Sequence, residues 1–298
     1  MQISLMLGNL RQPLEQALDT VQRLQIPAVQ VSAHGPFAPA TCGAPCRRQL
    51  REALHRRGLA LSAISGCGRG LDLGNAGRAQ EQLDAAFRAL EMAADLMADQ
   101  AVRIWQDHVG VLPNPPEGPR WDSFVRCAEA IARQGEKVGA CLAVETGPEP
   151  AAVVEKWMRT VDSPALRVNY DPANLILYPA LFRNDPHLIE QFGHPPKPYE
   201  KQAAFEEFEP IEGVRRLGRY IVHTHAKDAW VDQGVAREVP LGEGWVDWPR
   251  YLALLEDVGF DGYLAIERET GENPAADIAR AAEFLCRQLR RNRKSTPS

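Results

Sequence analysis

The sequence predicts an α/β protein with a single (β/α)8 TIM barrel. Segments with strand character and segments with helical periodicity alternate along the 298 residues, and eight of each can be counted. A barrel of this type commonly occupies about 250 residues as one domain. No GxGxxG fingerprint follows the first predicted strand, which disfavours an open dinucleotide-binding sheet.

The predicted elements follow in strict alternation. We expect strands at 2–7, 27–32, 59–65, 101–105, 140–145, 166–171, 219–225 and 262–267. Helical patterns lie at 12–25, 45–57, 78–98, 121–138, 150–160, 209–217, 248–258 and 274–290. Two helices carry clear start signals, because Asp247 precedes Trp248-Pro249 and Asn273 precedes Pro274.

One connection is unusually long. Residues 179–208 follow the sixth strand and are rich in proline and aromatic residues, including Phe182, Phe192 and Tyr199. Long loops of this kind are commonly functional, and βα loops open onto the active face of a barrel, so a lid or substrate wall is expected. A contact between subunits is the alternative. The barrel is expected over 1–290, with 291–298 as a basic, mobile tail.

Composition limits the class of protein. A hydrophobic fraction of 45% and a charged fraction of 24% are ordinary for a soluble protein, and the net charge of −5 argues mildly against a nucleic-acid partner. Met1 to Gly8 lacks the cationic start and long apolar run of a signal peptide, and no run of 18 apolar residues is present. We expect a cytoplasmic protein with no membrane contact.

The six cysteines are scattered and form no CxxC pair, so reduced thiols are the simplest interpretation. The alternative is a metal or redox site at Cys42 and Cys46, which stand four residues apart in a loop rich in proline and glycine.

Four successive strands end in residues that bind metal ions. Glu145, Asp171, His225 and Glu267 close the fifth to eighth predicted strands, each after an apolar stretch. The carboxyl ends of barrel strands meet on one face, and a shared cation would offset the cost of burying these carboxylates. Two glutamates, one aspartate and one histidine suit one divalent ion, Mn²⁺ first, with Mg²⁺, Co²⁺ or Zn²⁺ as alternatives.

His223 and His225 point to the same side of their strand because they are two residues apart. His225 lies nearer the carboxyl end and is the predicted ligand. His223 lies one layer deeper, where it either supports the site and its substrate or serves as a hydrogen-bonded core histidine.

The motifs at these strand ends resemble the sugar phosphate isomerase/epimerase family of xylose isomerase-like TIM barrels. They are Asp-Pro-Ala-Asn from 171, His-Thr-His-Ala-Lys-Asp from 223, Gly-Glu-Gly from 242 and Ile-Glu-Arg-Glu from 266. The resemblance implies that Glu145, Asp171, His225 and Glu267 are the metal ligands. It also implies that Glu145 and Glu267 are catalytic and move protons on opposite faces of a ketose, through a metal-stabilised enediolate.

Two departures from the family pattern affect the substrate. Ketose 3-epimerases usually carry a histidine three residues after the aspartate and an arginine six residues after the metal-binding histidine, where this chain has Asn174 and Val231. Type IV apurinic endonucleases in the same superfamily bind three zinc ions, but Ala236, Glu238 and Asn174 stand where further ligands would be expected. An apurinic endonuclease is therefore disfavoured.

Other residues are expected near the substrate. His34, Trp105 and His108 lie at or beyond strand ends, and Lys227 and Asp228 follow His225. We predict that the substrate-binding residues are His34, Trp105, His108, Asn174, His223, Lys227 and Asp228. The alternatives are solvated loop histidines, aromatic packing of Trp105, and a local ion pair of Lys227 with Asp228.

These features predict a metal-dependent isomerase or epimerase for a sugar, keto-sugar or polyol derivative. A lyase or dehydratase could share the first proton abstraction and then expel a β-substituent, as in inosose dehydration or 3-keto-glycoside cleavage. A carbohydrate-binding barrel without catalysis is a third possibility. The expected partner is a small carbohydrate, and a homo-oligomer is possible.

Overall fold

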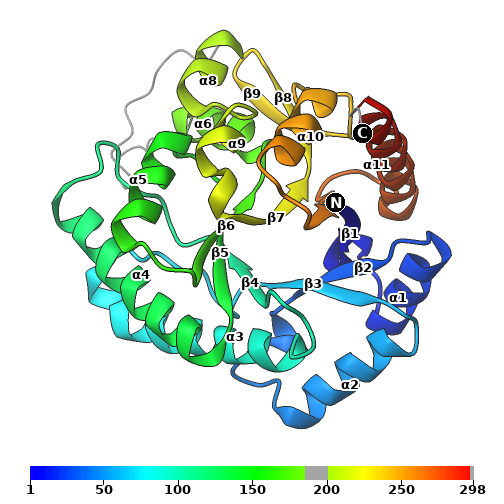
Figure 1. Cartoon of the computed structure of the whole chain (residues 1–298), viewed down its shortest axis with the longest axis horizontal. Helices are drawn as coiled ribbons and strands as arrows, with labels where there is room; N and C mark the ends of the chain where they lie inside the picture. Colours follow the sequence, from blue (N-terminus) through cyan, green and yellow to red (C-terminus); the bar gives the residue numbers. More distant parts are fainter. Residues whose placement is uncertain (185–200, 296–298) are drawn as a thin grey trace.

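A computed structural model describes residues 1–184 and 201–295. Eight parallel strands form a closed barrel in the order β1-β10-β7-β6-β5-β4-β3-β2, and helices surround it (Figure 1). The barrel strands are β1 Gln2–Met6, β2 Ala28–Ser32, β3 Ala60–Ser65, β4 Ile104–Asp107, β5 Cys141–Glu145, β6 Leu166–Tyr170, β7 Ile221–Ala226 and β10 Tyr263–Ile266. The predicted single-domain barrel is confirmed.

The helices pack outside the strands. They are α1 Leu14–Arg23, α2 Ala44–His55, α3 Ala79–Leu96, α4 Gly118–Val138, α5 Ala151–Val161, α6 Asn174–Asn184, α8 Lys201–Phe208, α9 Gly213–Leu217, α10 Trp248–Asp257 and α11 Pro274–Ser295. Both predicted start signals are confirmed: the side chain of Asp247 accepts a hydrogen bond from Arg250 N, and that of Asn273 accepts one from Ala276 N.

The barrel closes because β1 pairs with β10 in parallel register, with Leu5 opposite Ile266. Apolar side chains fill the space between strands and helices, including the fully buried Trp105 and Trp157. Inside the barrel, by contrast, a polar layer links Ser4, Ser62, His223 and Asn169. This layer forms a floor beneath the carboxyl ends of the strands.

Several boundaries differ from those predicted. The fourth strand lies at Ile104–Asp107 rather than 101–105. An antiparallel hairpin, β8 Asp228–Asp232 and β9 Val235–Val239, follows β7, where no strand was predicted. The expected long loop at 179–208 is helical at its two described ends, in α6 and α8, and 185–200 lie outside the described residues. Helix α11 runs on to Ser295, past the expected start of the tail.

The prediction that all cysteines are reduced is wrong for one pair. Cys42 and Cys46 form a disulfide, with 5.3 Å between their Cα atoms. A turn in which Ala38 O accepts from Cys42 N leads directly into α2, and it brings the two thiols together in space. Cys67, Cys127, Cys141 and Cys286 are free thiols.

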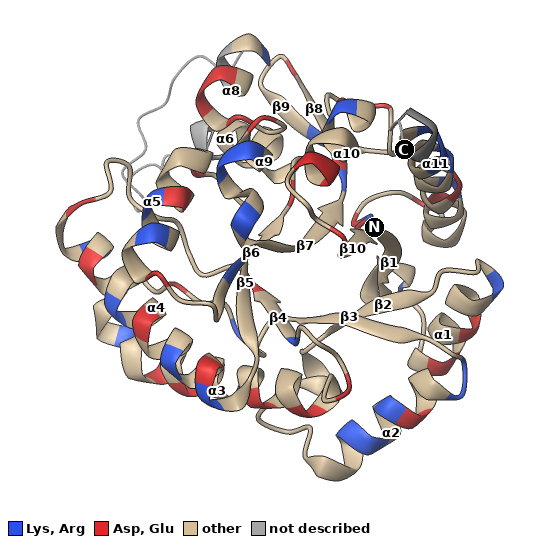
Figure 2. Cartoon of the chain, viewed as in Figure 1, with Lys and Arg blue, Asp and Glu red and all other residues tan. Residues whose placement is uncertain are grey.

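Charged residues of both signs are interspersed along the outer helices α2, α3 and α4 (Figure 2). Within residues 1–184 and 201–295, no helix has the length and apolar character needed to cross a bilayer. The cytoplasmic location and the absence of a nucleic-acid partner stay predictions.

Candidate metal centre

Four neighbouring strands bring the predicted ligands together. Glu145 ends β5, Asp171 follows β6, His225 is the fifth residue of β7, and Glu267 follows β10, and these strands are consecutive in the barrel. One ligand atom from each lies within 4.8 Å of the others. Asp171 and His225 are fully buried, and the two glutamates are only 6% exposed.

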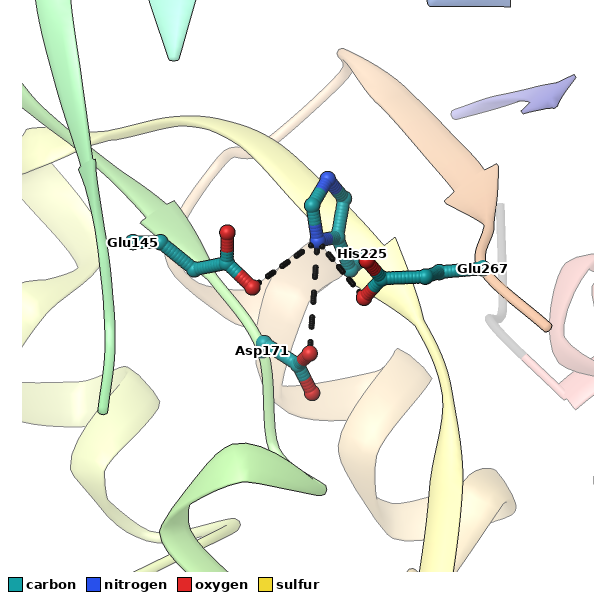
Figure 3. A group of neighbouring side chains, drawn as sticks. All are labelled: Glu145, Asp171, His225 and Glu267. Carbon is teal, nitrogen blue, oxygen red and sulfur yellow. Dashed lines mark hydrogen bonds and ion pairs between the residues drawn. The ribbon is translucent and has the colours of Figure 1, made fainter. Parts of the chain in front are cut away.

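The three carboxylates converge on one imidazole nitrogen (Figure 3). His225 Nδ1 lies 3.1 Å from Glu145 Oε1, 3.1 Å from Glu267 Oε2 and 4.0 Å from Asp171 Oδ2. Asp171 is oriented by its other oxygen, because Oδ1 accepts hydrogen bonds from Ala173 N and Asn174 N at the start of α6. That local turn leaves Oδ2 directed into the cluster.

Burial and charge oppose each other in this cluster. Burial and the carboxylates of Glu267 and Glu145 raise the pKa of Asp171, against the lowering effect of Lys227. Burial also tends to raise the pKa values of Glu145 and Glu267, but neighbouring cations outweigh it and both are lowered. The pKa of His225 is raised because its carboxylate neighbours outweigh the effect of burial.

The residues fit a divalent ion. Asp171 Oδ2 is buried and receives no hydrogen bond from any described residue, so it has an acceptor position available for a cation. Ligands on opposite sides of an ion bound at ~2.2 Å lie ~4.4 Å apart, close to the spread of these four atoms. Three carboxylate oxygens and one imidazole nitrogen favour Mn²⁺, Mg²⁺ or Zn²⁺ over softer ions.

Three other predicted residues lie beside the ligands. Asn174 Nδ2 donates to Glu145 Oε1 at 2.6 Å, and His108 Nε2 lies 3.3 Å from Glu145 Oε2. Lys227 Nζ lies 3.2 Å from Glu267 Oε2 and 2.7 Å from Glu269 Oε2. The side chain of His108 is 45% exposed and packs edge-on against Tyr178, so it lies at the edge of the cluster with access to solvent.

The remaining predicted residues have other surroundings. His34 is exposed, and its Nδ1 lies 3.0 Å from Ser32 Oγ. Trp105 points away from the barrel axis and donates its Nε1 hydrogen to Gly66 O in the core. The structure therefore places Trp105 outside the ligand cluster, because adjacent residues of a strand face opposite sides and Gln106 occupies the inward position.

The side chains of His223 and Asp228 form hydrogen bonds that stabilise the fold and do not face the ligand cluster. His223 is fully buried one layer below the ligands, bonded to Asn169 Oδ1 and Ser62 Oγ, as in the alternative of a core histidine. Burial and His225 lower the pKa of His223, so its ring is neutral. Asp228 does not face the cluster but accepts hydrogen bonds from Ala229 N, Gly242 N, Val246 N and Trp248 Nε1.

Sequence reasoning missed two glutamines that contact the ligands. Gln30 Oε1 lies 3.0 Å from His225 Nε2, and Gln106 donates its side-chain amide hydrogen to Glu145 Oε2. Gln30 is a polar residue between apolar neighbours in a buried strand, Val29-Gln30-Val31, and Gln106 follows the apolar pair Ile104-Trp105. The sequence signal that could have revealed them is a polar residue within a buried strand whose end carries no metal ligand.

The fold and the ligand cluster together define a (β/α)8 barrel with a candidate divalent-metal site at the carboxyl ends of its strands. A model of the xylose isomerase-like TIM barrel family matches residues 15–288, and the chain belongs to that family.

Individual proteins are similar to the chain over different lengths. The L-ribulose-5-phosphate 3-epimerase UlaE of Salmonella paratyphi B is 43% identical over 68 residues, 22% of this chain and 23% of that protein. The match thus spans less than a quarter of the curated relative. Two solved structures share the fold. One is a D-tagatose 3-epimerase-like protein, with a TM-score of 0.73 and 16% identity over 99% of each chain. The other is a xylose isomerase-like TIM barrel protein from Mycobacterium smegmatis in complex with magnesium, with a TM-score of 0.70 and 17% identity over 98% of this chain and 97% of that one.

Proposed function

We propose that this protein is a divalent-metal-dependent isomerase or epimerase that acts on a sugar, keto-sugar or polyol derivative. The observation that carries the proposal is the convergence of Glu145, Asp171, His225 and Glu267 within 4.8 Å. Family membership and the local similarity to a 3-epimerase support the same reaction class. Mn²⁺ is the proposed ion, with Mg²⁺, Co²⁺ and Zn²⁺ as alternatives.

Glu145 and Glu267 are the proposed proton-transfer pair. They approach His225 Nδ1 from opposite sides, one from β5 and one from β10 (Figure 3). Two carboxylates placed in this way can remove a proton from one face of a carbon atom and return one to the other face. When bound, the ion would act as a Lewis acid that acidifies a C–H bond beside a carbonyl group.

The two glutamates have different neighbours, which suits different roles. Glu267 contacts the buried ammonium group of Lys227, which favours its ionised form. Glu145 accepts from Asn174 and Gln106 and lies beside the partly exposed His108, through which a proton can exchange with solvent. We therefore assign Glu267 as the base in the resting protein, and Glu145 as the group that takes up a proton through His108 and delivers it to the opposite face of the substrate.

His108 also favours a second candidate function, the lyase. A partly exposed imidazole 3.3 Å from Glu145 Oε2 is a second proton donor at the edge of the site. Such a donor could protonate a departing oxygen after the first proton abstraction, which epimerisation does not require. Epimerase and lyase differ in the fate of the carbanionic intermediate, so product analysis separates them.

Deuterium exchange tests the proposed function directly. Mn²⁺-loaded protein is incubated in D₂O with ketoses, inososes and 3-keto-glycosides, and products are followed by NMR. We expect deuterium at the carbon beside the carbonyl group. Exchange without elimination identifies an epimerase or isomerase, whereas release of water or an alcohol identifies a lyase. We expect Glu267→Gln to lower exchange by at least ~10³-fold, since it removes a proton-transfer group.

Glu149→Gln is the matched control, because Glu149 is an equally buried carboxyl group outside the ligand cluster. Metal content is measured for both variants, so that loss of the ion is separated from loss of the proton-transfer group. Exchange at the wild-type rate in a metal-loaded Glu267→Gln protein would refute the assigned role. A metal-loaded wild-type protein that exchanges none of these substrates would favour the binding-only barrel.

A further inference from the structure

Two buried glutamines connect His225 to Glu145 through the opposite half of the barrel. Gln30 lies on β2 and Gln106 on β4, and neither strand contributes a ligand. His225 Nε2 lies 3.0 Å from Gln30 Oε1, Gln30 Nε2 donates to Gln106 Oε1 at 2.9 Å, and Gln106 Nε2 donates to Glu145 Oε2. Gln30 is fully buried and Gln106 is 3% exposed.

The direction of this chain is fixed at its carboxylate end. An ionised carboxylate only accepts hydrogen bonds, so the atom of Gln106 that faces Glu145 must be the amide nitrogen. The oxygen of Gln106 then faces Gln30, which must present its own nitrogen in return. The oxygen of Gln30 is left for His225, and His225 Nε2 must carry the hydrogen.

We propose that Gln30 and Gln106 form a positioning relay that holds the Nε2–H form of His225 and so presents Nδ1 to the metal ion. The inference rests on the proposed metal centre and deepens it. The opposite tautomer would require both amides to turn, which would place the oxygen of Gln106 against the carboxylate of Glu145. The relay thereby couples the orientation of one ligand to that of another across the barrel.

The surroundings of the relay support this role. Both glutamines lie among buried residues, where an amide group without a partner is costly, so the two side chains keep each other in place. The same bonds hold the side chain of Glu145, which the described structure also ties to Asn174. Neither glutamine touches the ligand atoms that face the cluster, so they act through His225 and Glu145.

Metal affinity of relay variants provides the first test. Gln30→Met and Gln106→Met keep side-chain volume and remove the amide group. We expect each to weaken Mg²⁺ and Zn²⁺ binding by about 10- to 100-fold in calorimetric titrations, the usual effect of removing a partner of a metal ligand. Either change interrupts the whole relay. The metal affinity of the double variant should therefore be close to that of the single variant with the lower affinity.

Gln82→Met is the matched control. Gln82 is a fully buried glutamine whose oxygen accepts from Asp72 N and whose nitrogen donates to Asn75 O, away from the ligand cluster. The substitution Gln82→Met removes a buried amide group at a comparable cost in folding stability, and it should leave metal affinity unchanged. Wild-type affinity in both relay variants, or effects that multiply in the double variant, would overturn the relay.

An NMR measurement tests the relay without the ion. In the metal-free protein, the Nε2–H proton of His225 should appear as a slowly exchanging, downfield resonance, assigned by its loss in His225→Gln. In Gln30→Met it should move upfield and exchange faster, while in Gln82→Met it should not change. Absence of the Nε2–H signal from the wild-type protein would refute the relay. If the wild-type protein binds no divalent ion but shows this signal, and the signal moves in Gln30→Met but not in Gln82→Met, the metal centre fails and the relay stands.

Discussion

Glu149 lies four residues after Glu145 and is equally buried, yet its partner is a backbone amide instead of an imidazole. Leu112 N donates to Glu149 Oε1 at 2.8 Å, which joins the loop after β4 to the loop after β5. Burial raises the pKa of Glu149 to about 7, and the backbone hydrogen bonds and Arg120 only partly oppose it. This carboxyl group therefore makes a pH-dependent contribution to stability.

The direction of this pH dependence follows from the number of protons that the native and unfolded states bind. The pKa rises from 4.5 towards about 7 on folding, so between these pH values the native state binds more protons than the unfolded state. The contribution is fully present below pH 4.5 and is lost as the pH rises to about 7. At 1.36 kcal/mol per pKa unit, the loss is about 3 kcal/mol.

We expect Glu149→Gln to remove this pH dependence. The amide oxygen can still accept from Leu112 N, but the side chain stays neutral at every pH. The variant should match the wild type near pH 4.5 and be more stable by up to about 3 kcal/mol at pH 8. Urea unfolding of metal-free protein across this range measures the difference, with Glu52→Gln on the exposed face of α2 as the control for removing one charge. Parallel profiles for Glu149→Gln and the wild type would show that burial does not perturb this group.

The β8–β9 hairpin and the loop that follows it depend on one buried carboxylate. Asp228 Oδ1 accepts from Ala229 N and Val246 N, and Oδ2 accepts from Gly242 N and Trp248 Nε1. Gly244 allows the close approach, because a Cβ atom there would lie 2.0 Å from Asp228 Oδ1. The Gly-Glu-Gly motif thus serves the packing of this loop around Asp228.

Asp228→Asn should loosen this element. An asparagine has one acceptor oxygen and an NH₂ group, so two of the four donors would face a donor instead of an acceptor. We expect a loss of about 2–4 kcal/mol in unfolding free energy and faster hydrogen exchange at Gly242 and Val246. Asp247→Asn is the matched control: asparagine caps a helix as well as aspartate does, so this change should cost little. Equal effects of the two substitutions would contradict the proposed role of Asp228.

The sequence predicted the elements that follow simple periodicity and missed those set by tertiary contacts. Seven strand ends and all four residues of the candidate metal cluster could be placed because apolar runs stop where the strands stop. The fourth strand was misplaced because Ala101-Val102 extends the apolar pattern before the strand begins. The hairpin was missed because its strands are five residues each and largely not buried.

At the site, the sequence predicted the four residues that the structure brings into one cluster, but not the residues that orient them. Glu145, Asp171, His225 and Glu267 stand at strand ends, a position visible in the chain. Gln30 and Gln106 act through partners 195 and 39 residues away, and such pairings exist only in the closed barrel. Predicting them requires the register of strands that are distant in sequence.

At the scale of the whole molecule, the ligands come from only half of the barrel. Strands β5, β6, β7 and β10 supply them, while β1 to β4 supply none, although β1 and β10 pair directly. The Gln30–Gln106 relay joins the two halves across the interior. Ion binding should therefore stabilise β1 to β4 as strongly as the strands that hold the ligands, provided that the barrel unfolds as one cooperative unit.

Hydrogen exchange with and without Mg²⁺ tests this expectation. At a free concentration 100 times Kd, a ligand that binds only the native state contributes about 2.7 kcal/mol, which slows exchange through global unfolding ~100-fold. We expect the same factor at Leu5 and Ile64, in the half without ligands, as at Val168 on β6, the strand that leads to Asp171. Asp171→Asn keeps the acceptor for Ala173 N but loses a ligand charge, so its exchange should not respond to Mg²⁺. Slowing confined to β5, β6, β7 and β10 would show that the two halves of the barrel open independently.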